Sequence, residues 1–176
     1  MRFRGAIVLG LMVLGLAARG DAFERMGMLG LNYVVGPSFI VGGDGATDAS
    51  SVEPGVGAGL QYGLTHNIDL RFDYDYIDAD LHTQAITFGG QWKFAPGSAW
   101  GPFVGGGLGF GKPFVGEGWD HFSLKLTGGL EKEITSSLSL APVVSYQFVD
   151  GIDPFGSVHV IEPGLRLIYY FGFVRT

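Results

Sequence analysis

The segment NIDLRFDYDYI (67–77) contains nine residues, Ile68–Tyr76, that alternate strictly between apolar and charged side chains. Its apolar residues fall at every second position, and aspartate or arginine occupies the positions between them. Alternate side chains of a β-strand point to opposite faces, whereas a helix would scatter this pattern around its axis. The segment is therefore predicted to be a strand with one apolar face and one charged face.

The same period of two recurs along the chain and predicts eight strands in all. It is clearest in HFSLKLTGGLE (121–131), SLSLAPVVSYQF (137–148) and LRLIYYFGF (165–173). Short turns are expected to alternate with longer loops between these strands, which is the layout of outer-membrane barrels. The strands are predicted at 28–41, 55–64, 67–77, 83–95, 100–111, 121–133, 137–149 and 158–173.

Four prolines fall within these strands, although proline has no N–H to donate to a neighbouring strand. They are expected to mark bulges or strand ends, where such a donor is not needed. The residues concerned are Pro37, Pro102, Pro142 and Pro163.

The apolar faces carry too many aromatic rings to point into a narrow barrel. An eight-stranded barrel is only just wide enough to be filled by ordinary side chains. Outside the barrel these rings would meet lipid, in two girdles near its ends, and closure would satisfy every backbone group. The predicted fold class is all-β: a transmembrane, eight-stranded, antiparallel up-and-down β-barrel. The outward rings are Phe72, Tyr74, Tyr76, Phe88, Trp92, Phe94, Trp100, Phe110, Phe122, Tyr146, Phe148, Tyr169, Phe171 and Phe173.

The first residues have the layout of a secretory signal peptide. Arg2 and Arg4 precede the apolar run Ala6–Ala18, which is shorter than the about 20 residues that a spanning helix needs. The small residue Ala22 follows, with Gly20 two positions before it. We therefore expect a signal peptide at 1–22 and an outer-membrane β-barrel domain at 23–176, with no second domain. The alternative is a buried N-terminal helix.

Composition limits the partners that the exported chain can have. Removing residues 1–22 leaves 8 basic and 16 acidic residues, a net charge of −8, which argues against binding to nucleic acid. The chain contains no cysteine, so it has neither a disulfide framework nor an N-terminal cysteine for a lipid anchor. No cofactor and no metal site is predicted.

Two stretches carry a resemblance to a known family. They are LTHNIDLRFDYDY (64–76) and the last strand LRLIYYFGF, which ends in an aromatic residue. With its alternating pattern, the chain resembles the small eight-stranded outer-membrane barrels of Gram-negative bacteria, of the OmpA transmembrane-domain and OmpX-like family. The resemblance implies a monomer in the cell outer membrane, surrounded by lipid and lipopolysaccharide.

The resemblance also implies insertion by the barrel-assembly machinery, which reads a terminal aromatic residue. In this sequence Val174, Arg175 and Thr176 follow Phe173, so the aromatic residue is not at the extreme terminus. We expect no peptidoglycan-binding domain and therefore no link to the cell wall.

The polar faces are predicted to line a lumen too narrow for bulk water. Unpaired charges there would be costly, so the charges should form a paired, hydrogen-bonded network that plugs the lumen. The alternative is a gated ion path in which arginine or lysine exchanges carboxylate partners; an open porin would need about sixteen strands. The predicted network is Asp69, Arg71, Asp73, Lys93, Lys125, Glu131, Glu162 and Arg166.

The glycine-rich stretch VGGGLGFGKP (104–113) contains most of a phosphate-binding loop, G-x-x-x-x-G-K. Pro113 replaces the Ser or Thr of that motif and no helical pattern follows, so a nucleotide site is not expected. Strand parity instead turns every second glycine to the lumen, where it would clear space for long cationic side chains. The expected neighbours are Gly107 with Lys125, and Gly59 and Gly89 with Arg71.

The loop end of the predicted barrel is acidic, and Lys112 is its lone basic residue. Such a cluster is usually a solvated rim, but a divalent cation bridging it to lipopolysaccharide phosphates is an alternative. The acidic residues are Asp44, Asp48, Glu53, Asp78, Asp80, Glu117, Asp120, Asp150 and Asp153.

Two further functions compete with a structural or surface-interaction role. His121 and Ser123, with Glu131 or Glu133 further along the strand, faintly resemble the His-x-Ser pair of the PagL-type lipid A deacylases. Leu124 replaces the usual Asn, and both residues have lumen-facing parity, so no enzymatic activity is predicted. A barrel that binds or transports small apolar ligands, as proposed for OmpW-like proteins, would require a lumen cavity that opens sideways.

Overall fold

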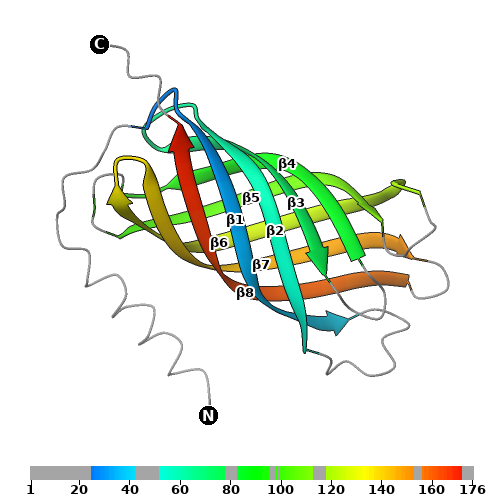
Figure 1. Ribbon diagram of the computed structural model, residues 1–176. Coiled ribbons are helices and arrows are strands. Elements are labelled where there is room, and N and C mark those ends of the chain that lie inside the picture. The colour runs from blue at the N-terminus through cyan, green and yellow to red at the C-terminus, as the bar shows by residue number, and fades with distance from the viewer. Residues whose placement is uncertain are drawn as a thin grey trace.

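The computed structural model describes residues 25–42, 52–77, 83–95, 98, 100–112, 118–152 and 156–171. These residues form one closed antiparallel barrel in which each strand pairs with its neighbours in sequence and β1 pairs with β8 (Figure 1). The predicted fold class is confirmed. The N-terminal segment proposed as a signal peptide and Phe173 lie outside the described residues. Within the described ranges, no helix is long and apolar enough to cross a membrane.

The strands begin and end within three residues of the predicted boundaries. One predicted loop, at 150–157, is mainly strand, because the β7–β8 ladder continues past a register shift as far as the pair Ile152 and Gly156. The strands are β1 (Leu29–Gly42), β2 (Val52–Gly63), β3 (Ile68–Ile77), β4 (Thr83–Lys93), β5 (Gly101–Lys112), β6 (His121–Thr135), β7 (Leu138–Ile152) and β8 (Gly156–Phe171).

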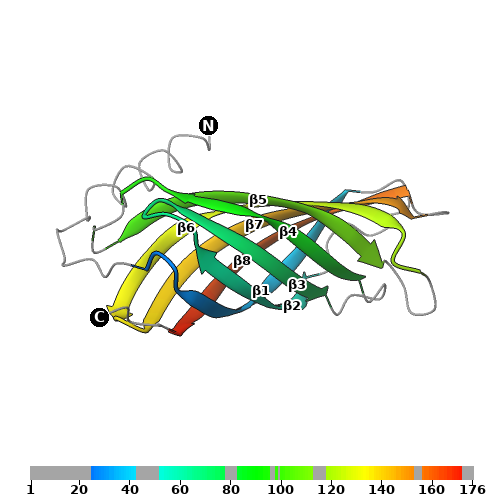
Figure 2. The same ribbon diagram turned by 90° about the horizontal axis from the view of Figure 1, so that it is seen from above.

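The strands cross the long axis of the barrel obliquely, as the view from above shows (Figure 2). The β6–β7 turn lies at the same end as the last residues of β8, and we call this the short-turn end. The opposite end, where β3 finishes and β8 begins, is the long-loop end.

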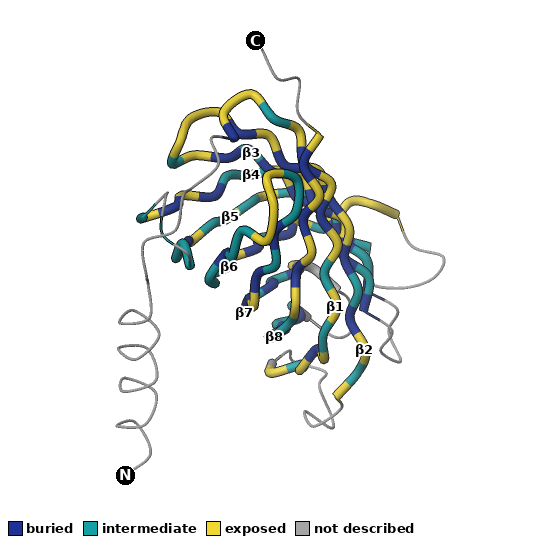
Figure 3. Tube along the Cα trace, turned by 60° about the vertical axis from the view of Figure 1, so that its left-hand side comes forward, coloured by how far each residue is buried: buried dark blue, intermediate teal, exposed yellow. Residues whose placement is uncertain are grey.

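Burial alternates along each strand, so that dark and light segments follow one another in Figure 3. In β3, Asp69, Arg71, Asp73 and Asp75 are buried, while the residues between them are exposed or half-buried. This is the pattern expected when one face of the sheet encloses a lumen and the other meets lipid.

The aromatic rings predicted to face outward do so. Tyr76, Trp100, Tyr146 and Phe148 are half-buried on the outer wall, and the other described rings of the set are exposed. At the short-turn end these rings lie against one another in pairs, as in Trp92–Phe94 and Tyr169–Phe171, with centroids 5.5 Å and 4.9 Å apart. Two rings point inward instead: Phe103 and Tyr170 are buried in the lumen.

Three of the four prolines do not mark the bulges or strand ends that were predicted. The β1–β8 ladder has a gap around Pro37 and Pro163, and the β6–β7 ladder has a gap beside Pro142, with the same register on both sides of each gap. Each strand therefore runs on, although three consecutive pairs around Pro37 and Pro163 and two beside Pro142 are not formed. Pro102, the second residue of β5, stands at a strand end as expected.

Gly89 holds β4 and β5 close together. A Cβ atom at Gly89 would collide with the backbone of Gly106 and Gly107 on β5. The adjacent Gly90 points the other way, and a Cβ there would make only an ordinary contact, 3.4 Å from the Asp69 carbonyl oxygen. The β4–β5 ladder thus depends on the first glycine and not on the second.

We predict that Gly89→Ala destabilises the barrel by about 1–3 kcal/mol, the usual cost of overpacking. Gly90→Ala, the matched control, should stay within about 0.5 kcal/mol of the wild type. Urea unfolding of the protein in lipid vesicles measures both, and equal stabilities of the two variants would contradict this account of β4 and β5.

Candidate functional site

The charged side chains that alternate with the apolar face meet inside the barrel. The structure places all eight residues of the predicted network on the lumen face, on β3, β4, β6 and β8. Seven of them are buried and Glu162 is half-buried. Their contacts divide into a group at the short-turn end and a group halfway along the lumen.

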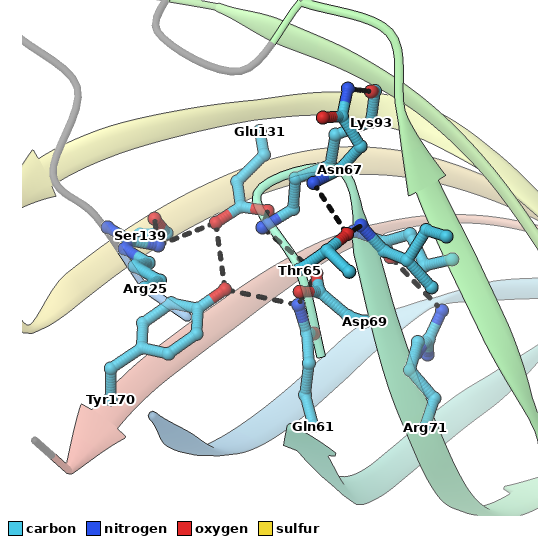
Figure 4. A network of polar contacts seen from close by, with 12 residues as sticks. Arg25, Gln61, Thr65, Asn67, Asp69, Arg71, Lys93, Glu131, Ser139 and Tyr170 are labelled. Carbon is cyan, nitrogen blue, oxygen red and sulfur yellow. Dashed lines mark hydrogen bonds and ion pairs between the residues drawn. The ribbon is translucent and has the colours of Figure 1, made fainter. Parts of the chain in front are cut away.

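The group at the short-turn end is a closed ring of five residues, which we call the Glu131 ring (Figure 4). The Lys93 Nζ atom lies 2.9 Å from Asp69 Oδ2 and 3.3 Å from Glu131 Oε2. The Tyr170 hydroxyl donates to Glu131 Oε1 at 3.0 Å, and Gln61 Nε2 donates to Tyr170 at 3.1 Å and to Asp69 at 2.6 Å. Side chains of β2, β3, β4, β6 and β8 are joined in this way across the lumen.

Arg25, which precedes β1, adds a second cation to this ring. Its guanidinium donates to Glu131 Oε1 at 2.7 Å and to the Ser139 hydroxyl at 2.6 Å. The same group lies over the Tyr170 ring, 3.9 Å from the centroid, and only 6% of Arg25 is exposed. The segment before the first strand therefore places its charge in the mouth of the lumen, as Figure 4 shows.

Two glycines allow the backbone around Arg25 to place this side chain beside Glu131. Gly27 adopts a φ of +79° and donates its N–H to the Gly63 carbonyl at 2.7 Å. A side chain at Gly63 would collide with the Arg25 carbonyl oxygen. Glycine at both positions thus allows the chain to turn across the end of β2. The alternation of strand residues gives no signal for Arg25, because it lies before the periodic pattern begins.

The group halfway along the lumen contains two ion pairs and a shared amide. Arg71 contacts Asp73 at 2.6 Å, and Lys125 Nζ bonds both oxygens of Asp75 at 2.6 and 2.7 Å. Arg166, with 1% of its surface exposed, donates to Gln91 Oε1 at 3.1 Å.

Arg166 lies beside a shared amide and an aromatic ring. Arg71 shares the same Gln91 oxygen, at 3.5 Å, so a neutral amide stands between two guanidiniums. The Arg166 guanidinium also lies 5.3 Å from the centroid of the Phe103 ring, within the range of a cation–π contact. Together with Ala141 and Val143, Phe103 forms a small apolar cluster in the lumen wall.

The long-loop end of the lumen is apolar, which the sequence analysis did not predict. Ile77, Val149, Val158 and Val160 form a buried cluster there, with Ile40 packed against it. These residues continue the inward parity of their strands, but they carry no charge. The lumen therefore carries its charged network from the short-turn end to its middle, and an apolar cluster beside the uncharged Thr83 and Ser123 fills the long-loop end.

Of the three predicted pairs between a glycine and a lumen cation, two are confirmed and one is wrong. Gly107 pairs with Lys125 and Gly89 pairs with Arg71, but Gly59 pairs with Asp73 instead. The β2–β3 ladder pairs Gln61 with Arg71 and ends with the pair Gly63 and Asp69, so Gly59 lies two positions from its expected neighbour.

The expected role of the glycines, clearing space for the lumen cations, is not what their contacts show. Cβ atoms at Gly89 and Gly107 would meet the neighbouring strand, whereas the glycines of β2 make room for carboxylate oxygens. A Cβ at Gly57 would come within 2.7 Å of Asp75 Oδ1, and one at Gly55 within 2.8 Å of Glu162 Oε1. On the other side of the lumen, Gly89, Gly107, Arg71 and Lys125 help to line a cavity of about 10 Å³. That space is about the size of one water molecule.

The residues of the deacylase alternative do not lie together on the outer wall. Ser123 is fully buried in the lumen, where its oxygen accepts a hydrogen bond from Gln147 at 3.3 Å. His121 Nδ1 lies 3.0 Å from the Asp150 carbonyl oxygen at the rim, and both glutamates contact Arg25. A lipid reaching the barrel from outside would not meet this serine.

The acidic rim is only partly described. Glu53, Asp120 and Asp150 are described, and the other predicted rim residues lie outside the described ranges. Among the residues that the structure covers, no group of three or more His, Cys, Asp or Glu side chains is arranged to hold a metal ion.

Comparison with known proteins assigns the fold. A scan against protein families and a search of curated proteins both gave no match. Among solved structures, the chain is similar to Neisserial surface protein A, with 12% identity over 81% of this chain and 97% of that one and a TM-score of 0.65. The β-barrel domain of Pseudomonas aeruginosa OprF is 14% identical over 82% and 98%, with a TM-score of 0.54.

The attachment invasion locus protein Ail of Yersinia pestis is 13% identical over 82% of this chain and 99% of that one, with a TM-score of 0.50. The fold is therefore that of the small outer-membrane β-barrels, as the resemblance in the sequence predicted. A designed transmembrane barrel, 17% identical over 85% and 99%, matches with a TM-score of 0.54. Because a designed protein shares the fold, the fold by itself does not define the function of this chain.

We predict that Arg25→Ala lowers the free energy of unfolding by about 2–3 kcal/mol, because the buried Glu131 loses a charged hydrogen-bond donor. Lys132→Ala is the matched control, since Lys132 contacts the Trp100 ring and not the Glu131 ring. It should change stability by less than about 1 kcal/mol. Urea unfolding in vesicles separates the two, and a neutral Arg25→Ala would show that the Glu131 ring does not need this cation.

Proposed function

We propose that this protein is a monomeric outer-membrane β-barrel with a plugged lumen that acts as a structural or surface-interaction protein. One observation carries the proposal: the outer wall is apolar while the interior charges are joined to one another across the lumen. The apolar outer wall would contact membrane lipid, including lipopolysaccharide. The barrel-assembly machinery would insert the protein into the membrane.

The contacts across the lumen support a plug more than a path. The Glu131 ring and Arg25 occupy the short-turn end, and the apolar cluster around Val149 occupies the long-loop end. The cavity beside Lys125 holds about 10 Å³, far less than the about 300 Å³ or more of a typical small-molecule site. These features do not favour a gated ion path, and we propose that the lumen residues fill the barrel. A larger cavity of about 740 Å³ is lined mainly by residues of the outer wall, such as Trp92, Val104 and Leu126, and an apolar ligand would fit there and not in the space beside Lys125.

The placement of Arg25 also supports export with cleavage on its N-terminal side. A cut after Arg25 would remove the cation that Glu131 and Ser139 contact. A cut after Ala22 keeps it as the third residue of the exported chain.

We expect N-terminal sequencing of the protein from isolated outer membranes to begin at Phe23. A mature chain that starts after Arg25, or one that keeps Arg2 and Arg4, would contradict the proposed signal peptide.

We expect the wild-type protein to give no steady conductance in a planar bilayer. Arg71→Ala should also be silent, because both the Glu131 ring and the apolar cluster remain in place. A sixteen-stranded porin reconstituted in the same way verifies the assay. Discrete channels from the wild type, altered by Arg71→Ala, would replace the plug with a gated ion path.

A further inference from the structure

A chain of three hydrogen-bonded side chains lies on the outer wall at the long-loop end. The Ser157 oxygen is 3.2 Å from His159 Nε2, and the Tyr146 oxygen is 2.6 Å from His159 Nδ1. The intervening residue Val158 is buried in the lumen, so Ser157 and His159 point to the opposite, outer side. All three side chains are half-buried.

A serine hydroxyl, an imidazole and a third side chain arranged in this sequence are typical of a serine that a histidine activates as a nucleophile. A hydroxyl touches one nitrogen of an imidazole, and the other nitrogen is held by a third side chain. With the ring proton on Nδ1, His159 donates to Tyr146, and Nε2 accepts the Ser157 hydroxyl proton. The Phe148 ring packs edge-on against His159, with centroids 5.1 Å apart, and limits the orientations of the imidazole.

The surroundings favour a lipid as the molecule that meets this serine. Val41 on β1 and Ile161 on β8, which share the outer face, are exposed apolar side chains. Ser157 is the second residue of β8, so it lies at the end of the strands and not halfway along the wall. His159 pairs with Phe148 in the β7–β8 ladder, and Phe148 and Tyr146 belong to the aromatic rings of the long-loop end. Such rings mark the boundary between acyl chains and headgroups, where the ester bonds of lipids lie.

We propose that Ser157 and His159 form an esterase site for acyl esters of membrane lipids, with Tyr146 as the positioning residue. The inference rests on the proposed membrane location and adds a chemical activity to it. It also differs from the pair His121 and Ser123, whose serine is buried in the lumen.

The reaction needs only water as a second reactant. The Ser157 oxygen attacks the acyl carbonyl carbon while His159 Nε2 takes the hydroxyl proton. The carbon–oxygen bond to the lipid alcohol breaks, and His159 returns the proton to the departing alkoxide. Water then attacks the acyl-serine, giving its proton to His159, which restores the Ser157 hydroxyl as the fatty acid leaves. No group is oxidised or reduced.

The first test uses the full mature chain in detergent and a fluorophosphonate probe, with the modified residue located by mass spectrometry. We expect labelling at Ser157 in the wild type and in the control Ser123→Ala. Ser157→Ala and His159→Gln should lose at least about nine-tenths of the labelling rate, because a general base supplies about 10²–10⁴-fold. An unlabelled Ser157, or equal labelling in a folded His159→Gln, overturns the proposal.

The second test identifies the source of the ester. The protein is placed in phosphatidylethanolamine–phosphatidylglycerol vesicles with and without lipopolysaccharide, and released fatty acids are measured by mass spectrometry. Release from either lipid, lost in Ser157→Ala, supports the proposal and names the substrate, whereas no release overturns the lipid assignment. A chain that labels in detergent but does not insert into vesicles contradicts the proposed membrane location and not the site.

Tyr146→Phe separates positioning from a structural role. The ring that packs near His159 is kept, and only the hydroxyl that holds Nδ1 is removed. We expect kcat to fall about tenfold with KM unchanged, the effect of an orienting group on a base. An unchanged kcat would remove Tyr146 from the site.

Discussion

The pairing of β1 with β8 is the contact on which the rest of the structure depends. Without it the sheet would have two open edges, and neither edge could satisfy its N–H and carbonyl groups in lipid. With it, one face of every strand is enclosed and the other becomes the outer wall. The ladder tolerates the gap at Pro37 and Pro163, since the register is the same on both sides of the gap.

Closure also creates the main energetic problem of the fold, which is how to fill a narrow, charged interior. Removing a buried charge from water is costly unless hydrogen bonds and an opposite charge replace the solvent. Lys93 meets this requirement by lying between Asp69 and Glu131, and Lys125 meets it by bonding both oxygens of Asp75. Arg166 uses an amide and an aromatic ring instead of a carboxylate.

Side chains on the enclosed face and on the outer wall therefore differ in which molecules can reach them. The polar groups in the lumen are enclosed, although some atoms, such as Gln91 Nε2 and Gln147 Oε1, have no hydrogen-bond partner among the described residues. Ser123 is an example of an enclosed hydroxyl that no outside molecule meets. A reactive group that serves the membrane has to lie on the outer wall near the strand ends, as Ser157 and His159 do. The same sequence motif, a serine and a histidine two residues apart, thus has opposite consequences on the two faces.

The sequence by itself determined the strands, their inward and outward faces and the barrel, because period-two alternation is local and repeats in every strand. It also predicted which charges line the lumen. The tertiary structure decided the partners: Arg25 lies outside any strand, and its place beside Glu131 depends on a turn at Gly27. The register of the β2–β3 ladder puts Gly59 beside Asp73, and pairing between β7 and β8 brought Tyr146 to His159. Contacts between distant strands depend on register and closure, which single-strand patterns do not contain.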